Sequence, residues 1–314
     1  MSTVKDDYIC HSYIPGGNLS AEAVAKINFS QITHTNIAFA LVAKDPNGFF
    51  VPDISENVLA GIKLVQAEIK RQVAKSKMLI SIGGWGAGNF CEAAATDQSR
   101  TAFAEKCLDY LKSTGIQGID IDWEYPGRCE DVISACKNCK TDYIKLCKTI
   151  RDVIGGAYLL TAAVGSHLSR DLDWAKLNDV FDYVNVMTYD MSKSAHSSFV
   201  KTTMSMRLWS GSGFDKSKLV LGIPFYARCK NEQYNAKGYA DLMALVRAGK
   251  ATLQSSRNQD YVVIDGNRCG IDTPASIARK GIWVKKNGYA GMFNWQEMTD
   301  DNGELRAAMR DSLD

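Results

Sequence analysis

The chain has 314 residues, of which 46% are hydrophobic and 23% are charged, an ordinary composition for a globular protein. Its formal net charge of +2 argues against a nucleic acid or an anionic membrane as partner. No apolar run reaches the roughly 18 residues of a membrane span, and the N-terminus "MSTVKDDYIC" lacks the apolar core of a signal peptide.

Short apolar runs rich in Val, Ile and Ala alternate along the chain with longer segments of helical periodicity. We expect eight strands, which begin near Tyr8, Thr35, Lys77, Gly118, Leu159, Tyr183, Leu219 and Ala290. Asp97 is expected to cap a helix that stops at Gly115, and Thr273 and Gly288 to bound another. This alternation predicts an α/β protein with a (β/α)8 TIM barrel, and a doubly wound open sheet is the alternative.

One interval, from about 229 to 270, departs from this rhythm. It contains a polar loop, the helix-like "YADLMALVRAG" and the strand-like "YVVID". We interpret it as a small insertion after the seventh strand. Because no linker-like segment of low complexity is present, we expect residues 1–314 to form a single catalytic barrel domain.

The chain contains nine cysteines, a high and odd number. Cys129, Cys136, Cys139 and Cys147 lie close together, and disulfides among them would indicate a secretory environment. Cys136-x-x-Cys139 is also compatible with a zinc site, but no second such pair follows it, so we expect no metal. We expect a bridge between Cys229 and Cys269. The protein is expected to be secreted or extracellular, with the cytoplasm as the alternative because no signal peptide is visible.

The segment "GIDIDWEYP", Gly118 to Pro126, contains three acidic residues at every second position. In a strand, Asp120, Asp122 and Glu124 share one face, with neighbours about 6–7 Å apart. Carboxylates that face a barrel interior are costly unless they are paired, protonated or functional; a polar edge strand facing water is the alternative. Crowded like charges share protons, which raises at least one pKa and can hold a general acid protonated near neutral pH.

This segment resembles the signature of family 18 glycoside hydrolases, the chitinases, in which it ends the fourth barrel strand. The resemblance implies that Glu124 protonates the glycosidic oxygen and later acts as base on the incoming water. The acetamido oxygen of the substrate would attack the anomeric carbon, as this family is known for substrate assistance. Asp122 would orient the acetamido N–H, and Asp120 would support Asp122 from below.

Other segments resemble further motifs of the family, in the family order. "SIGGW" would supply Ser81, a hydrogen-bond donor to the deep aspartates, and Trp85, a sugar platform. "MTYD" would supply Tyr189 as a donor to the acetamido oxygen, with Met187 and Asp190 contacting substrate. "GMFNWQ" would supply Trp295 as the hydrophobic floor. The remaining residues expected to line the groove are Phe39, Tyr226 and Arg228, the last two from "GIPFYAR".

The resemblance also implies non-proline cis peptides at Ala38–Phe39, Glu124–Tyr125 and Trp295–Gln296. The chain departs from the family pattern at Gln117, where an Asp is usual and where we expect a structural adjustment. His11 is expected to take the place of a Tyr behind the aspartates, where it would face Asp120; the alternative is that it points elsewhere. The short insertion implies an open cleft and internal cleavage.

The resemblance therefore implies an endo-acting chitinase that hydrolyses β-1,4-linked N-acetylglucosamine polymers with retention of configuration. The expected partners are chitin and chitooligosaccharides, without nucleic acid or membrane, and we expect a monomer without cofactor or metal. A non-catalytic chitinase-like lectin is one alternative, although such proteins typically lose the acid that this chain retains at Glu124. An endo-β-N-acetylglucosaminidase acting on N-glycans is the other.

Overall fold

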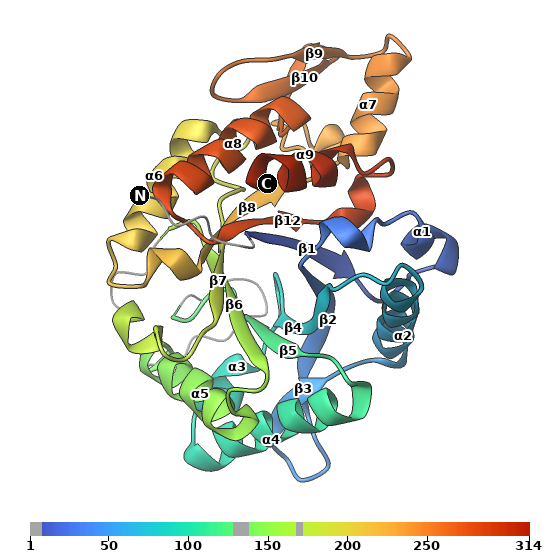
Figure 1. Cartoon of the computed structure of the whole chain (residues 1–314). Helices are drawn as coiled ribbons and strands as arrows, with labels where there is room; N and C mark the ends of the chain where they lie inside the picture. Colours follow the sequence, from blue (N-terminus) through green and yellow to red (C-terminus); the bar gives the residue numbers. More distant parts are fainter. Residues whose placement is uncertain (1–7, 128–137, 168–171) are drawn as a thin grey trace.

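The computed structural model describes residues 8–127, 138–167 and 172–314, and within them eight parallel strands close into a barrel (Figure 1). Every neighbouring pair of barrel strands is parallel, and the pairing of the first strand with the second closes the ring. The strands are β1 (Ile9–Pro15), β2 (His34–Lys44), β4 (Lys77–Gly83), β5 (Gly118–Asp122), β6 (Leu159–Gly165), β7 (Tyr183–Met187), β8 (Leu219–Pro224) and β12 (Gly291–Trp295). The eight strands expected from the sequence and the TIM barrel are thus confirmed, and the open sheet is excluded.

Helices surround the barrel and pack their apolar faces against the strands. They are α1 (Ala21–Ala25), α2 (Glu56–Arg71), α3 (Phe90–Ala94), α4 (Asp97–Thr114), α5 (Cys139–Ile154), α6 (Phe199–Ser210), α8 (Pro274–Asn287) and α9 (Glu304–Leu313). Trp123, the residue after β5, is an example, because its ring stacks on that of Phe90 in α3 with centroids 5.2 Å apart.

The helix ends follow local capping chemistry. Thr273 caps α8 through a capping box with Ser276, Pro274 occupies the first turn and Gly288 ends the helix with a positive φ of 72°, as expected. For α4 the expected cap was wrong by one residue. Thr96, and not Asp97, is the N-cap. Its hydroxyl accepts from the Ser99 N–H, and the Ser99 hydroxyl accepts from the Thr96 N–H.

Two additions to the barrel have no place in a regular repeat of strand and helix. β3 (Phe50–Asp53) pairs antiparallel with the end of β2. Between β8 and α8 the chain forms α7 (Tyr239–Arg247) and a sheet of β9 (Thr252–Gln254), β10 (Asp260–Ile264) and β11 (Asn267–Ile271). This segment projects to one side of the barrel in Figure 1. The expected Cys229–Cys269 disulfide is present, with an S–S distance of 2.01 Å.

The other cysteine predictions are resolved in part. Cys147 is a buried thiol and Cys139 is disulfide-bonded. Cys129 and Cys136 lie outside the described residues. Within the described part of the chain, no three His, Cys, Asp or Glu side chains gather in a way that could hold a metal ion.

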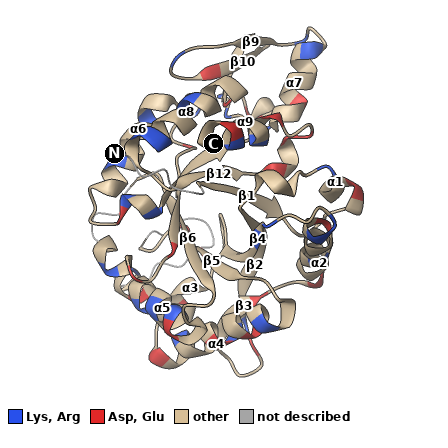
Figure 2. Cartoon of the chain, in the orientation of Figure 1, with Lys and Arg blue, Asp and Glu red and all other residues tan. Residues whose placement is uncertain are grey.

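Acidic and basic residues are interspersed along the outer helices (Figure 2). None of the helices in the described ranges combines the length and apolarity needed to cross a membrane.

Candidate active site

The three acidic residues of "GIDIDWEYP" lie at the carboxyl end of β5. Asp120 and Asp122 alternate with Ile119 and Ile121, so the two aspartates face the barrel interior while the isoleucines join the core under the helices. Glu124 follows the last residue of the strand. Asp120, Asp122 and Glu124 therefore follow one another from the centre of the barrel to its carboxyl-end rim, where the active sites of TIM barrels lie.

Asp120 is fully buried and saturated with hydrogen bonds. Its Oδ2 accepts from the hydroxyls of Ser81 (2.7 Å) and Tyr13 (2.9 Å), and its Oδ1 accepts from the Thr161 hydroxyl (2.5 Å). Burial raises the pKa of Asp120, whereas these hydrogen bonds act in the opposite direction. The donors come from three strands, β4, β1 and β6, so the barrel itself fixes the orientation of this carboxyl group.

Asp122 lies above Asp120 in a different environment. Its Oδ1 is buried and has no hydrogen-bond partner among the described residues. Burial, together with the charges of Glu124 and Asp120, raises the pKa of Asp122 well above its usual range. This carboxyl group therefore has one buried oxygen available for a ligand.

A cleft of about 1280 Å³ opens above these carboxyls. Ten of the twelve residues expected at the site line it: Phe39, Trp85, Asp122, Glu124, Met187, Tyr189, Asp190, Tyr226, Arg228 and Trp295. The other two, Asp120 and Ser81, lie beneath it and are fully buried. The barrel thus brings together side chains that are up to 256 positions apart in the sequence, from Phe39 to Trp295.

The two glycines of "SIGGW" allow the chain after β4 to pass close to its neighbours. A Cβ on Gly83 would lie 2.0 Å from the Asp122 carbonyl oxygen, and a Cβ on Gly84 would lie 2.7 Å from the Phe39 ring. The Gly84 N–H donates to that same Asp122 carbonyl at 2.9 Å. This close approach leads directly to Trp85, whose side chain is 60% exposed beside the cleft.

Aromatic rings form the floor of the cleft. Trp295 stacks on Phe39 with centroids 5.3 Å apart and meets the ring of Tyr13 edge-on at 5.9 Å. Tyr189 packs edge-on against Phe293 and Tyr226. Burial raises the pKa of Tyr189 well above its usual range, so its hydroxyl keeps its proton and can act as a donor.

Asp190 and Arg228 form an ion pair on one side of the cleft. Arg228 Nε and Nη2 each donate to one carboxylate oxygen at 2.6 Å, a two-point contact, and the guanidinium lies over the Tyr226 ring at 5.0 Å. His196 Nδ1 lies 3.3 Å from Asp190 Oδ1. Burial alone would raise the pKa of Asp190, but hydrogen bonds from Arg228 and His196 hold it well below its usual range.

The expectation for His11 was wrong. Tyr13 reaches Asp120, and His11 lies one layer deeper, stacked on Tyr13 with centroids 5.2 Å apart. The two residues share the inward face of β1, so alternation alone could not tell which of them is level with Asp120. Burial lowers the pKa of His11 to about 4, and the imidazole is therefore neutral near pH 7 and not a cation beside Asp120.

Gln117 has the structural role that was expected of it. Its Oε1 accepts from the Met78 N–H at 2.8 Å and its Nε2 donates to the Gly115 carbonyl at 2.7 Å. These bonds tie the start of β5 to β4, at the end of the barrel away from the cleft. The three expected cis peptides, at Ala38–Phe39, Glu124–Tyr125 and Trp295–Gln296, are all present.

Several residues at the site escaped the sequence analysis. Thr161 on β6 is paired in register with Asp120, and Asn185 on β7 donates to the Tyr13 hydroxyl at 2.9 Å. Tyr125 lines the cleft beside Glu124, and His196 lies behind Asp190. The signal for Thr161 and Asn185 was their place as single polar residues within otherwise apolar strands.

The chain matches a known protein family along most of its length. The family model of glycosyl hydrolases family 18 matches residues 12–300. Among curated proteins, the chain is similar to Chitinase 1 of Aphanocladium album, with 27% identity over 80% of this chain and 68% of that protein.

Two solved structures match almost the whole chain. A glycoside hydrolase family 18 N-acetylglucosaminidase from Paenibacillus barengoltzii has a TM-score of 0.83 and 26% identity, and the match covers 98% of this chain and 100% of that one. A chitinase-like agglutinin from Robinia pseudoacacia has a TM-score of 0.80 and 24% identity over 98% of this chain and 100% of that one. The second likeness concerns the fold alone.

Proposed function

Because this chain belongs to glycosyl hydrolases family 18, we propose that it is a chitinase that cleaves β-1,4-linked N-acetylglucosamine polymers by a retaining, substrate-assisted mechanism. The observation that carries the proposal is the row of three carboxyl groups along β5 and just after it, whose surroundings differ from one to the next. Asp120 is saturated with donors, Asp122 has a raised pKa and an unpartnered oxygen, and Glu124 lies in the cleft.

In the first step Glu124 donates its proton to the glycosidic oxygen, and the bond from that oxygen to the anomeric carbon breaks. The acetamido oxygen of the substrate forms the new bond to the anomeric carbon, which gives an oxazolinium ion and the free leaving-group sugar. No protein nucleophile is required, which fits a site whose inward-facing acids come from a single strand. In the second step Glu124 takes a proton from water, and the water oxygen attacks the anomeric carbon from the face that the leaving group vacated. The bond from the acetamido oxygen to the anomeric carbon breaks in this step.

Asp122 orients the acetamido group and balances the charge of the intermediate. Its unpartnered Oδ1 is the acceptor for the acetamido N–H. Asp120 lies below it and takes up part of the change in charge, because three hydroxyl donors stabilise its carboxylate. Tyr189 donates a hydrogen bond to the acetamido oxygen and holds that oxygen in line with the anomeric carbon, a placement that favours the attack.

The remaining residues bind the sugar chain. Trp295 offers an aromatic face to the apolar C–H surface of the pyranose at the cleavage point, and Trp85 is a platform on the leaving-group side. Met187 and Tyr226 close the wall, and the Asp190–Arg228 pair supplies charged hydrogen-bonding groups to the sugar hydroxyls and amide. The exposed ring of Trp85 and the half-buried ring of Trp295 favour a polymer over a single small sugar.

The anomer of the first product tests the mechanism. Proton NMR of a chitin oligomer during hydrolysis should detect the β anomer first, because attack from both sides in succession restores the starting configuration. An α anomer as the first product would refute substrate assistance.

We propose internal cleavage, since the segment between β8 and α8 contains α7 and three short strands, a small size that suits an open cleft. The similarity to a family 18 N-acetylglucosaminidase makes release of single sugars from a chain end the second candidate. The product pattern from the hexamer of N-acetylglucosamine distinguishes the two. Internal cleavage gives dimers, trimers and tetramers at early times, whereas end-wise cleavage gives the monomer and pentamer.

Two other activities are separated from chitin hydrolysis by assaying the hexamer beside a glycoprotein with N-linked glycans. Release of the glycan alone would identify an enzyme of N-glycan cleavage. Binding of the hexamer without hydrolysis of either substrate would identify a lectin. We further propose that the protein works in a secretory or extracellular setting, because the Cys229–Cys269 disulfide is suited to an oxidising compartment.

A further inference from the structure

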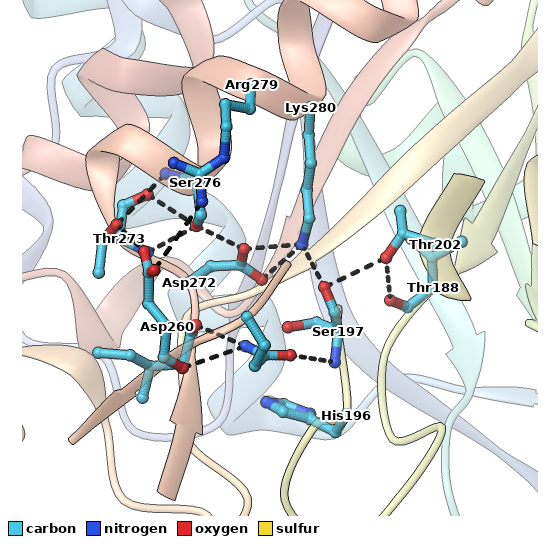
Figure 3. Close-up of polar contacts among 12 residues, drawn as sticks. Thr188, His196, Ser197, Thr202, Asp260, Asp272, Thr273, Ser276, Arg279 and Lys280 are labelled. Carbon is cyan, nitrogen blue, oxygen red and sulfur yellow. Dashed lines mark hydrogen bonds and ion pairs between the residues drawn. The ribbon is translucent and has the colours of Figure 1, made fainter. Parts of the chain in front are cut away.

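A buried lysine lies behind the side of the cleft formed by Asp190 and Arg228. The side chain of Lys280, on α8, is 1% exposed. Its Nζ donates to both carboxylate oxygens of Asp272, at 2.7 and 2.8 Å, and to the Ser197 carbonyl at 2.7 Å (Figure 3). All three ammonium protons thus have an acceptor. A buried ion pair is a weak source of stability, because desolvation offsets its attraction, so its geometric effect is the feature to explain.

The Lys280–Asp272 pair joins three parts of the chain. Lys280 belongs to α8, Asp272 follows β11 at the exit of the insertion, and Ser197 belongs to the loop 190–198 that follows β7. Gln259 completes the junction. Its Oε1 accepts from the Ser197 N–H at 3.2 Å, and its Nε2 donates to the Ile271 carbonyl at 2.7 Å. Both backbone polar groups of Ser197 are therefore held by side chains from outside its own loop (Figure 3).

The loop 190–198 connects the fixed residue Ser197 to Asp190 at the cleft. His196, next to Ser197, has a fully buried side chain whose Nδ1 lies 3.4 Å from the Asp190 N and 3.3 Å from Asp190 Oδ1. The His196 carbonyl accepts from the Met191 N–H at 3.1 Å. Asp190 itself has a positive φ of 55°, a conformation that a non-glycine residue adopts only where its surroundings require it.

The same insertion also holds the partner of Asp190. The Arg228 N–H donates to the Gly270 carbonyl at 3.1 Å, and the Gly270 N–H donates back at 2.9 Å. A Cβ on Gly270 would lie 1.7 Å from the Ser194 carbonyl oxygen, so β11 and the loop 190–198 are in direct backbone contact. Asp190 and Arg228 thus reach each other from two segments that β11 and Lys280 fix together.

We propose that Lys280, with Asp272, is a positioning residue that fixes the loop 190–198 so that Asp190 meets Arg228 at the cleft and presents the pair to the sugar chain. This assignment rests on the proposed function insofar as the Asp190–Arg228 pair binds substrate. Lys280 acts on substrate binding and not on proton transfer, because its hydrogen bonds run to Asp272 and Ser197 and not to β5.

The test uses variants that remove the pair without leaving one buried charge alone. Lys280→Met combined with Asp272→Asn removes both charges and keeps similar volumes. With the soluble tetramer of N-acetylglucosamine, KM is expected to rise about tenfold while kcat stays within about threefold of the wild type. If that double variant does not fold, Gln259→Met loosens Ser197 without touching a charge and should shift KM in the same direction.

A matched control lies at the opposite end of the barrel. Arg151 donates to Asp182 at 2.6 Å and to the carbonyls of Val180, Gly155 and Tyr158, and Asp182 precedes β7 whereas Asp190 follows it. Arg151→Met combined with Asp182→Asn removes a comparable set of contacts. It should lower Tm and leave KM unchanged, which separates positioning from a general loss of stability.

Hydrogen–deuterium exchange of the free protein tests, without any substrate, whether Lys280 and Asp272 fix the loop 190–198. The amides of Asp190, Met191 and Ser197 should exchange faster in the Lys280→Met/Asp272→Asn variant than in the wild type, and not in the Arg151 control. Unchanged exchange there, or a folded double variant with unchanged KM, would overturn the proposal. If the wild type neither cleaves nor binds the tetramer, the proposed function fails, whereas faster exchange at these amides still supports the positioning role.

Discussion

Asp120 and Asp122 lie on the same face of β5 with Ile121 between them in the sequence, yet they differ in the hydrogen bonds that their carboxyl groups accept. Asp120 accepts hydrogen bonds from the hydroxyls of Ser81, Tyr13 and Thr161, whereas Asp122 Oδ1 has no partner in the described part of the chain. Hydroxyl donors favour a charged carboxylate, and an undonated, buried carboxyl favours the protonated form. Of the two, Asp120 is therefore the better stabilised as a carboxylate, and Asp122 is the one with an oxygen open to substrate.

The Tyr189 hydroxyl is expected to stabilise the transition state more than the bound substrate. Tyr189→Phe should lower kcat by about 10²-fold while KM changes little, because a donor that holds the attacking acetamido oxygen in line acts mainly on the chemical step. Tyr183→Phe is the matched control, since Tyr183 begins the strand that leads to Tyr189 and lies at the opposite end of the barrel. Equal effects of the two substitutions on kcat would contradict the role of Tyr189.

The Tyr13 hydroxyl is expected to set the pH dependence of the aspartate pair. It is one of the donors that oppose the upward shift of the pKa of Asp120, which burial causes. Tyr13→Phe removes that donor, so the macroscopic pKa of the pair should rise and the acidic limb of the kcat/KM profile should move to higher pH. The profile of the variant, measured between pH 3 and 8 on a soluble oligomer, provides the check. An unmoved acidic limb would show that Asp120 is not part of the titrating pair.

The buried histidines of β1 and β2 should weaken the fold in acid. Burial lowers the pKa of His11 to about 4 and that of His34 to about 3, whereas an unfolded His titrates near 6.5. Below that pH the unfolded chain binds more protons than the folded one, so the free energy of unfolding falls as pH drops towards the folded pKa. His11 alone should account for a loss of about 2 kcal/mol between pH 7 and pH 5.

Urea unfolding at these two pH values, compared between the wild type and His11→Gln, measures this contribution. The variant is expected to be less stable at pH 7, because Gln does not reproduce the ring stacked on Tyr13, but to lose less stability on going to pH 5. An equal loss in both proteins would mean that His11 is already charged in the folded state.

The sequence predicted the parts of this molecule that depend on local pattern. The eight barrel strands follow from apolar runs, and the capping of α8 follows from Thr273, Pro274 and Gly288. Ten of the twelve expected site residues line the cleft. Nine of these ten lie at the carboxyl ends of strands or just beyond, which a TIM barrel brings to one rim, and Phe39 lies within β2.

The sequence did not predict how deep a side chain lies within the barrel, or which side chains from distant strands are in contact. His11 and Tyr13 share one face of β1, so the choice of which reaches Asp120 depends on the register between strands and on the tilt of the barrel. Thr161 and Asn185 stand out in the sequence as single polar residues of apolar strands, but their contacts with Asp120 and Tyr13 depend on how β6 and β7 pair with their neighbours. The link from Lys280 to Ser197 spans 83 residues and follows no local rule.

The central claim is that Glu124 moves the proton that breaks the glycosidic bond, and Glu124→Gln tests it most directly. The amide keeps the shape of the side chain but cannot donate a proton in this way. Turnover of the hexamer of N-acetylglucosamine should fall by about a thousandfold, while circular dichroism and hexamer affinity remain those of the wild type. A folded variant that binds the hexamer and retains more than a few per cent of the wild-type turnover would contradict the account.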